Sequence, residues 1–310
     1  MTSKVITIDC QYISSEFAAA YLLIENDRAV FIENNTYHAV PILLKALEDH
    51  NIPRENVDHL IVTHIHLDHA GGSSELLKYL PNAKVLAHPK AANHLINPSR
   101  LIESSKKVYG EDLFEKLYGK IHPISEDKVR VMQDNEELEF GNRKLKFIYT
   151  KGHANHHFVI YDSSSNGVFT GDSFGISYPF LRTGKEPFLF PTTTPTDFNA
   201  EEARKSVHKI IETGADKIFL THFGVWNDIQ LGKEQMLAGI NEMEKIFLFA
   251  KKSSIENEIL IKECEFMIKV YMEKEMSERG LLPYMDNLKG DFYMNAQGLV
   301  YAAKRSKSAP

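Results

Sequence analysis

Residues 63–72 constrain the fold of this chain more than any other segment, because they read Thr-His-Ile-His-Leu-Asp-His-Ala-Gly-Gly. Three histidines and one aspartate stand within six residues, directly after an apolar run at 60–63 that predicts a buried strand. A buried strand is rigid and positions the loop at its end, so an α/β protein can expose polar groups on that loop. Imidazole and carboxylate donors together suit zinc, iron or manganese. The segment therefore predicts a metal site at a strand end.

Three later positions repeat this arrangement. His153, Asp172 and His222 each follow a short apolar run that predicts a strand, and each lies within two residues of a glycine. Glycine lets the backbone turn sharply or approach its neighbours closely. A lone histidine is usually a surface residue or a satisfied core residue, but repeated potential ligands at strand ends favour a metal-binding role.

The first two-thirds of the chain alternate short β-branched runs with helical patterns. Residues 40–50 predict a helix because their apolar positions follow the 3.6-residue period. Residues 199–212 predict another helix, with Asn199 as its N-cap and Gly214 just past its end.

After about residue 226 the pattern becomes helical. Two long helices are predicted, the second over 255–276 with Ser253 and Glu256 as a capping box. We predict an α/β fold, an αββα sandwich formed by residues 1–226, followed by a C-terminal helical extension of residues 227–310. Periodicity alone leaves several other α/β folds open.

Composition and charge argue against several classes of protein. The 310 residues are 43% hydrophobic and 25% charged, which is enough for a sizeable core. A net charge of −6 without a long basic run argues against a nucleic-acid-binding surface. Cys10 and Cys264 make neither a disulfide framework nor a cysteine-based zinc site, and we expect two thiols in a reducing compartment. No signal peptide or membrane span is visible in the sequence, so we expect a cytoplasmic protein.

The motif His-x-His-x-Asp-His, with the later His, Asp and His in the right order, resembles the metallo-β-lactamase superfamily. The similar branch is the one that includes glyoxalase II and related hydrolases, and the resemblance covers roughly residues 1–225. It implies two metal ions, the first bound by His64, His66 and His153, the second by Asp68, His69 and His222, and both bridged by Asp172. Lys151 departs from the proline of many relatives but lies outside the ligand set. His157 is a candidate to support the ligands rather than to bind metal, although the absence of a functional role is the favoured interpretation.

The resemblance implies a binuclear hydrolase that needs no side-chain nucleophile. Two divalent ions with these ligands keep a net positive charge and lower the pKa of bound water toward about 7. A metal-bridging hydroxide would then attack an ester, thioester or lactone carbonyl, with Asp68 orienting the hydroxide and passing protons. The expected cofactors are two divalent metal ions, zinc first, with iron or manganese as other candidates.

An aromatic, proline-punctuated stretch lies between the last two ligands. A loop there could cover the metals, and Tyr178 could then donate a hydrogen bond to a developing oxyanion while Arg182 held a substrate carboxylate. The alternative is a loop packed under the helical extension. The helical extension could itself cover one side of the site, contribute to the hydrophobic core, or form a homodimer interface. We predict a small-molecule substrate and neither a nucleic-acid nor a membrane partner.

The same pattern of candidate metal ligands is compatible with other functions. A diiron redox or oxygen-binding protein is the main alternative, but relatives with that chemistry carry Glu where this chain has His66. Nucleases of the superfamily insert a large domain among the later motifs, whereas only 49 residues separate Asp172 from His222. A binding module without turnover is disfavoured by the complete ligand set. Fold resemblance alone does not make the protein a β-lactamase.

Overall fold

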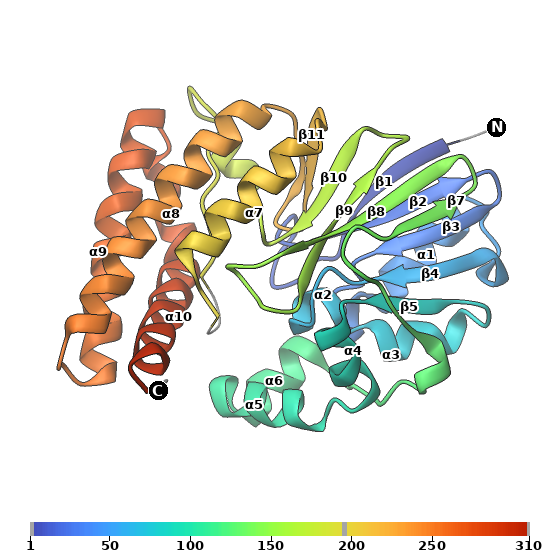
Figure 1. Ribbon diagram of the computed structural model, residues 1–310, viewed down its shortest axis with the longest axis horizontal. Helices are drawn as coiled ribbons and strands as arrows, with labels where there is room; N and C mark the ends of the chain where they lie inside the picture. Colours follow the sequence, from blue (N-terminus) through green and yellow to red (C-terminus); the bar gives the residue numbers. More distant parts are fainter. Residues whose placement is uncertain (1–2, 194–196, 309–310) are drawn as a thin grey trace. The chain divides into compact units, whose positions relative to one another are not determined.

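The computed structural model describes residues 3–193 and 197–308 (Figure 1). The described residues fall into two compact units. The sheet unit comprises residues 3–149, 156–171 and 213–227, and the helical unit comprises 150–155, 172–193, 197–212 and 228–308.

The sheet unit contains two mixed sheets in the described part of the chain. The first has the order β1 (Ser3–Asp9), β2 (Ala19–Glu25), β3 (Arg28–Ile32), β4 (Val57–Ile61), β5 (Lys84–Ala87) and β6 (Val129–Val131). Its strands are antiparallel from β1 to β3 and parallel from β3 to β6. The second has the order β12 (Gly224–Trp226), β11 (Lys217–Leu220), β10 (Gly167–Gly171), β9 (His157–Asp162), β8 (Arg143–Thr150) and β7 (Glu137–Phe140). In this sheet β10 and β11 are parallel, whereas β9 and β10 pair antiparallel.

Strand β2 shows how the core of the sheet unit is built. Tyr21 and Leu23 point to one face and pack with Phe147 of the second sheet, so one core lies between the sheets. Leu22 and its alternate neighbours point to the other face, because successive side chains of a strand alternate. That face packs against α1 (Val40–Asp49), α3 (Ser73–Leu76) and α4 (Pro89–Ile96). Helices α2 (Leu67–Ala70), α5 (Ser99–Tyr109) and α6 (Glu111–Tyr118) complete the helices of this unit's described residues.

The helical unit is formed by α7 (Ala200–Glu212), α8 (Ile229–Lys252), α9 (Asn257–Arg279) and α10 (Lys289–Ser308). Helix α8 packs against α7, α9 and α10 (Figure 1). Met236, Ile240 and Met243 on α8 are at most 2% exposed, so this apolar face forms core. Arg204 of α7 also makes a bidentate ion pair with Glu244 of α8. None of the described helices has the length and apolar character that a membrane span requires.

Most of the predicted helix boundaries are confirmed. Helix α1 matches 40–50, and the Asn199 side chain accepts a hydrogen bond from the Glu202 backbone at the start of α7. The capping box at Ser253 is wrong, because the Ser253 backbone N–H still bonds to Phe249 and ends α8. Helix α9 therefore begins later, at Asn257.

The sequence pattern changes at the point where the last strand ends. Strand β12 ends at Trp226, and α8 begins at Ile229. The compact units are divided differently, since 150–155 and 172–212 group with the C-terminal helices. A domain boundary between residues 226 and 227 stays a prediction.

Candidate metal centre

Each predicted ligand follows the carboxyl end of a strand, as the sequence indicates. The segment 64–69 follows β4 and leads into α2, while His153 follows β8, Asp172 follows β10 and His222 follows β11. In sheets with parallel neighbours, functional side chains gather beyond the carboxyl ends of the strands. The sheet unit holds the ligands of the first segment and His222, and the helical unit holds His153 and Asp172.

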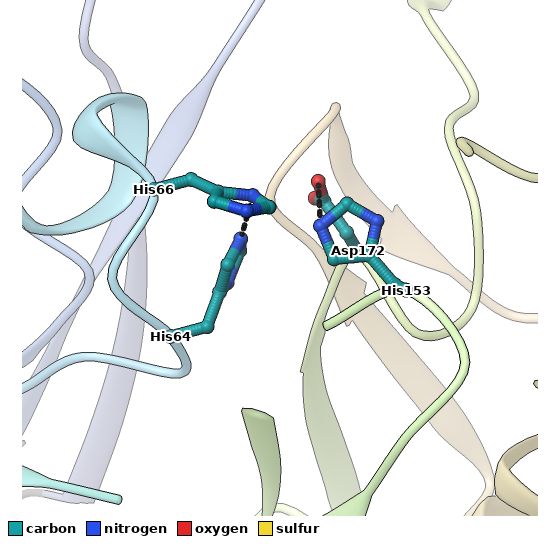
Figure 2. A group of neighbouring side chains, drawn as sticks. All are labelled: His64, His66, His153 and Asp172. Atoms are coloured by element: carbon teal, nitrogen blue, oxygen red, sulfur yellow. Dashed lines mark hydrogen bonds and ion pairs between the residues drawn. The ribbon is translucent and has the colours of Figure 1, made fainter. Parts of the chain in front are cut away.

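In the sheet unit, Asp68, His69 and His222 form one group. One donor atom from each lies within 4.8 Å of those of the other two. Asp68 Oδ2 is 3.4 Å from His222 Nε2 and 3.8 Å from His69 Nε2. The two histidines are buried, whereas the Asp68 side chain is 23% exposed. His64 Nε2 also faces His66 Nδ1 at 2.7 Å (Figure 2).

In the helical unit, the side chains of His153 and Asp172 lie next to each other (Figure 2). His153 Nε2 lies 3.4 Å from Asp172 Oδ2, and both residues are buried. Helix α7 holds the loop before His153, since the Asn199 backbone donates to the Gly152 carbonyl at 2.9 Å. Gly152 has φ +107, and a Cβ there would lie 2.3 Å from the Ala203 backbone nitrogen. Only glycine therefore fits this approach of the loop to α7.

Glu33 is a functional candidate that the sequence reasoning missed. It stands directly after β3 and is 1% exposed. Glu33 Oε1 accepts from the hydroxyl of Thr63, from His69 Nδ1 at 3.1 Å and from Thr221 Oγ1 at 3.5 Å, while Oε2 accepts from the Thr63 backbone at 3.3 Å. The available signal was a single acidic residue at a strand end. That signal is weaker than a histidine motif, because one carboxylate does not define a ligand set.

The contacts of Glu33 fix which nitrogen of two histidines carries the proton. His69 Nδ1 donates to Glu33, which leaves the lone pair on His69 Nε2. The Thr63 hydroxyl donates to Glu33, so it accepts from His64 Nδ1 at 3.0 Å. His64 then also carries its lone pair on Nε2. A metal-binding imidazole requires this neutral form, with its other nitrogen held by a protein acceptor.

His222 is oriented in the same way by a main-chain acceptor. Its Nδ1 donates to the Phe17 carbonyl at 2.8 Å, so Nε2 carries the lone pair beside Asp68. Three histidines of the sheet unit thus present Nε2 lone pairs. All three lie in groups with a carboxylate, His64 and His69 with Glu33, and His69 and His222 with Asp68. This donor chemistry fits a divalent cation such as zinc.

Tyr178 and Arg182 are engaged within the helical unit. Tyr178 is 2% exposed, and its hydroxyl donates to Asp291 Oδ1 of α10 at 3.1 Å. Arg182 donates from Nε to Ser177 Oγ at 3.0 Å and from Nη2 to the Ser177 carbonyl at 2.9 Å. These contacts favour the alternative of a loop packed with the helical extension. The catalytic role of Tyr178 stays a prediction.

The comparison with protein families places the chain in a superfamily. The model of the metallo-beta-lactamase superfamily matches residues 23–222. The chain therefore belongs to the metallo-beta-lactamase superfamily, and the predicted resemblance is confirmed at that level.

Individual relatives have low sequence identity to this chain. The chain is 30% identical over 227 residues to the metallo-beta-lactamase fold-containing protein ST1585 of Sulfurisphaera tokodaii. The aligned region covers 72% of this chain and 81% of that protein. It is 28% identical over 159 residues to a probable hydroxyacylglutathione hydrolase of Schizosaccharomyces pombe, covering 50% of this chain and 48% of that protein.

Solved structures show the same fold. The crystal structure of ST1585 from Sulfolobus tokodaii has a TM-score of 0.64 at 22% identity and covers 96% of this chain and 99% of its own. A metallo-beta-lactamase family protein of Thermus thermophilus, TTHA1429, has a TM-score of 0.66 at 18% identity, covering 99% of this chain and 94% of its own. The predicted αββα sandwich with a C-terminal helical extension is confirmed.

Proposed function

We propose that this chain is a binuclear metal-dependent hydrolase of an ester, thioester or lactone. The observation that supports it most is the set of Nε2 lone pairs that Glu33, Thr63 and the Phe17 carbonyl maintain on three histidines. A protein that used these histidines only for packing would have no need to fix the same tautomer in all three.

The proposed ligand assignment follows the order of the superfamily motifs. His64, His66 and His153 would hold the first ion, and Asp68, His69 and His222 the second. Asp172 would bridge them. The group of Asp68, His69 and His222 within 4.8 Å supports the second half of this assignment. The contact between His153 and Asp172 supports their sharing one ion.

Bound divalent ions would supply a nucleophile from water at neutral pH and would polarise a substrate carbonyl. The chain's own residues would orient and move protons. Asp68 is suited to this because its partly exposed carboxylate lies beside two ligands and can accept a proton from solvent water. Glu33 would act indirectly, by holding His69 and His64 in their metal-binding form.

The substrate class and metal are part of the proposal. The name of the Schizosaccharomyces pombe relative supports a thioester among the candidate substrates. We propose zinc as the native metal, with iron or manganese as alternatives, and a cytoplasmic location. A homodimer through the C-terminal helices stays a prediction. The apolar face of α8 does not support it, because this face is buried within the helical unit.

We expect tag-free protein to contain about two zinc or manganese ions per chain and to hydrolyse at least one member of an ester, thioester and lactone panel. Elemental mass spectrometry and a spectrophotometric panel measure these two quantities on one preparation. Stripping the metal with a chelator should abolish turnover, and adding zinc back should restore it. Full activity in metal-free protein would exclude this mechanism.

The same measurement tests the diiron alternative. His66 favours hydrolysis, because the related diiron proteins carry Glu at that position. Two irons with a visible absorption band and no turnover on the panel would instead support a redox or oxygen-binding function.

Replacing Glu33 with Gln should weaken metal binding by about 10- to 100-fold while preserving side-chain volume. The amide removes the negative charge and replaces one accepting oxygen with a donating group, so it cannot accept from the Thr63 backbone at one oxygen and from the Thr63 hydroxyl and His69 at the other, as the carboxylate does. A zinc titration against a competing chelator measures the affinity. Glu139→Gln, on the exposed face of β7, is the matched control and should bind zinc like the wild type. Equal affinity in both variants would contradict the role of Glu33.

A further inference from the structure

Helix α9 of the helical unit is apolar on two faces. One face is buried and packs against α8 and α10 through Leu260, Cys264, Ile268, Met272 and Met276. The other face exposes Ile259 to 53%, Phe266 to 64% and Val270 to 50%. In Figure 1, α9 lies at the edge of the helical unit, next to α8 and α10. A helix that is apolar on all sides is normally buried on all sides, so the exposed face calls for a partner.

The three exposed side chains form one stripe along α9. Their spacings of seven and four residues correspond to two turns and one turn, so they lie within about 40° of one another around the helix. Single exposed apolar residues are common on protein surfaces, whereas a group of them on one face indicates an interaction site. We call Ile259, Phe266 and Val270 the α9 stripe.

Two lysines and two glutamates flank the α9 stripe, and all four are exposed. Lys262 and Glu273 lie on one side of it, and Glu263 and Lys274 lie on the other. Within the part of the chain that the structure describes, Lys274 pairs with the adjacent Glu275 at 4.0 Å and the other three make no ion pair. The flanks carry no net charge, so they fit neither a strongly acidic nor a strongly basic partner.

An antiparallel copy of α9 complements the α9 stripe. In a dimer with two-fold symmetry and antiparallel helices, positions equally far before and after the axis lie opposite one another. When the axis is level with Ile268, Phe266 of each copy faces Val270 of the other, since each lies two residues from the axis. Packed helices approach to about 8–10 Å, which is close enough to bury both side chains.

The same arrangement pairs the charges that flank the stripe. Lys262 lies six residues before Ile268, and Glu273 lies five residues after it on the same side, so the two face each other between copies. Glu263 and Lys274 face each other in the same way on the opposite side. Two-fold symmetry forms each of these contacts twice. Opposite charges beside an apolar seam select the partner and the orientation of paired helices.

We propose that the α9 stripe is the interface of a homodimer, in which α9 packs antiparallel against its counterpart and each flanking lysine faces a glutamate of the other copy. This inference concerns assembly and does not depend on the proposed hydrolase chemistry. Because two paired helices form a small interface, we expect a dissociation constant in the micromolar range.

Sedimentation-velocity ultracentrifugation of the full chain over a micromolar concentration series measures the dimer. Phe266→Ser should weaken dimerisation by about 30-fold or more, because aromatic side chains near the centre of an interface contribute most of its binding free energy. Tyr293→Ser is the matched control, since it removes an aromatic side chain that is 47% exposed on α10 of the same unit. The control should dimerise like the wild type.

Charge reversal tests the orientation of the two helices. Lys262→Glu and Glu273→Lys each place like charges opposite one another twice in the dimer, so each variant alone should dimerise about fivefold or more weakly. An equimolar mixture of the two variants should form a heterodimer with the affinity of the wild type, because every contact again joins a lysine and a glutamate.

The outcomes separate this inference from the proposed function. A wild-type chain that stays monomeric, or equal dimerisation of Phe266→Ser and the wild type, would overturn the interface. Weakened charge variants that do not rescue each other would overturn the antiparallel arrangement. Turnover is measured on the same samples, so an active monomer would contradict only the dimer, and an inactive dimer only the hydrolase. If Phe266→Ser fails to fold, the charge variants and their mixture carry the test.

Discussion

Asp172→Ala is expected to abolish hydrolysis and to release most of the bound metal. Asp172 is the proposed bridge between the ions and one of two carboxylates in the ligand set, so its loss removes a shared donor and a negative charge. Even residues that only support metal ligands contribute about 10- to 100-fold to affinity. We therefore expect metal affinity to fall by at least about 100-fold, measured by elemental analysis after gel filtration alongside kcat/KM.

The control for this variant is His208→Ala on the exposed face of α7. It removes a histidine from the helical unit without touching the proposed ligand set, and it should retain metal and activity. Circular dichroism of Asp172→Ala should match the wild type, since the substitution removes no large apolar side chain. An Asp172→Ala protein that keeps two ions and full turnover would refute the bridging role.

Arg143→Met is expected to destabilise the sheet unit by about 3–5 kcal/mol. Arg143 is 2% exposed and pairs with two buried carboxylates, with Nε 3.2 Å from Glu25 and Nη1 bonded to Asp162. Its Nη2 also donates to the Lys4 carbonyl at 2.9 Å. Methionine fills much of the volume but leaves both carboxylates buried without their cation, and an uncompensated buried charge is strongly destabilising. Urea unfolding followed by circular dichroism gives the free energy of unfolding.

The matched control is Arg130→Met at an exposed ion pair. Arg130 is 43% exposed and lies 2.7 Å from Glu136, and such surface pairs contribute about 0–1 kcal/mol. A loss of stability in Arg143→Met no larger than in this control would show that the buried ion cluster does not stabilise the fold.

The destabilisation by Arg143→Met should also shrink on acidification. Burial raises the pKa of Glu25, but hydrogen bonds from Ser3 and Asn142 and the charge of Arg143 outweigh it, so the folded-state pKa is lowered. A lowered carboxyl pKa contributes stability above the ordinary value of 4.5, and this contribution is lost as the pH falls through the folded value. The difference in unfolding free energy between the two proteins should therefore be smaller below pH 4.5 than at neutral pH. A constant difference would exclude this linkage.

The sequence alone determined the features that depend on neighbours in the chain. Strands show as apolar runs, and a ligand at a strand end needs no knowledge of distant residues, so the positions of His153, Asp172 and His222 were predictable. The same holds for the Asn199 cap, because a cap side chain bonds within its own first helical turn. The failed cap at Ser253 shows the limit, since two helices competed for one residue and only the structure showed which helix it ends.

The tertiary structure alone decided the contacts between residues far apart in the chain. Glu33 bonds to Thr63 and Thr221, 30 and 188 residues away, and Arg143 bonds to Glu25 across 118 residues. Tyr12, from the loop between β1 and β2, likewise lies in one apolar cluster with Phe114 and Tyr118 of α6. Such contacts leave no periodic pattern, because each depends on which elements the packing of the core brings together. The chain's local chemistry thus predicts the candidate ligands, while long-range packing selects the residues that orient them.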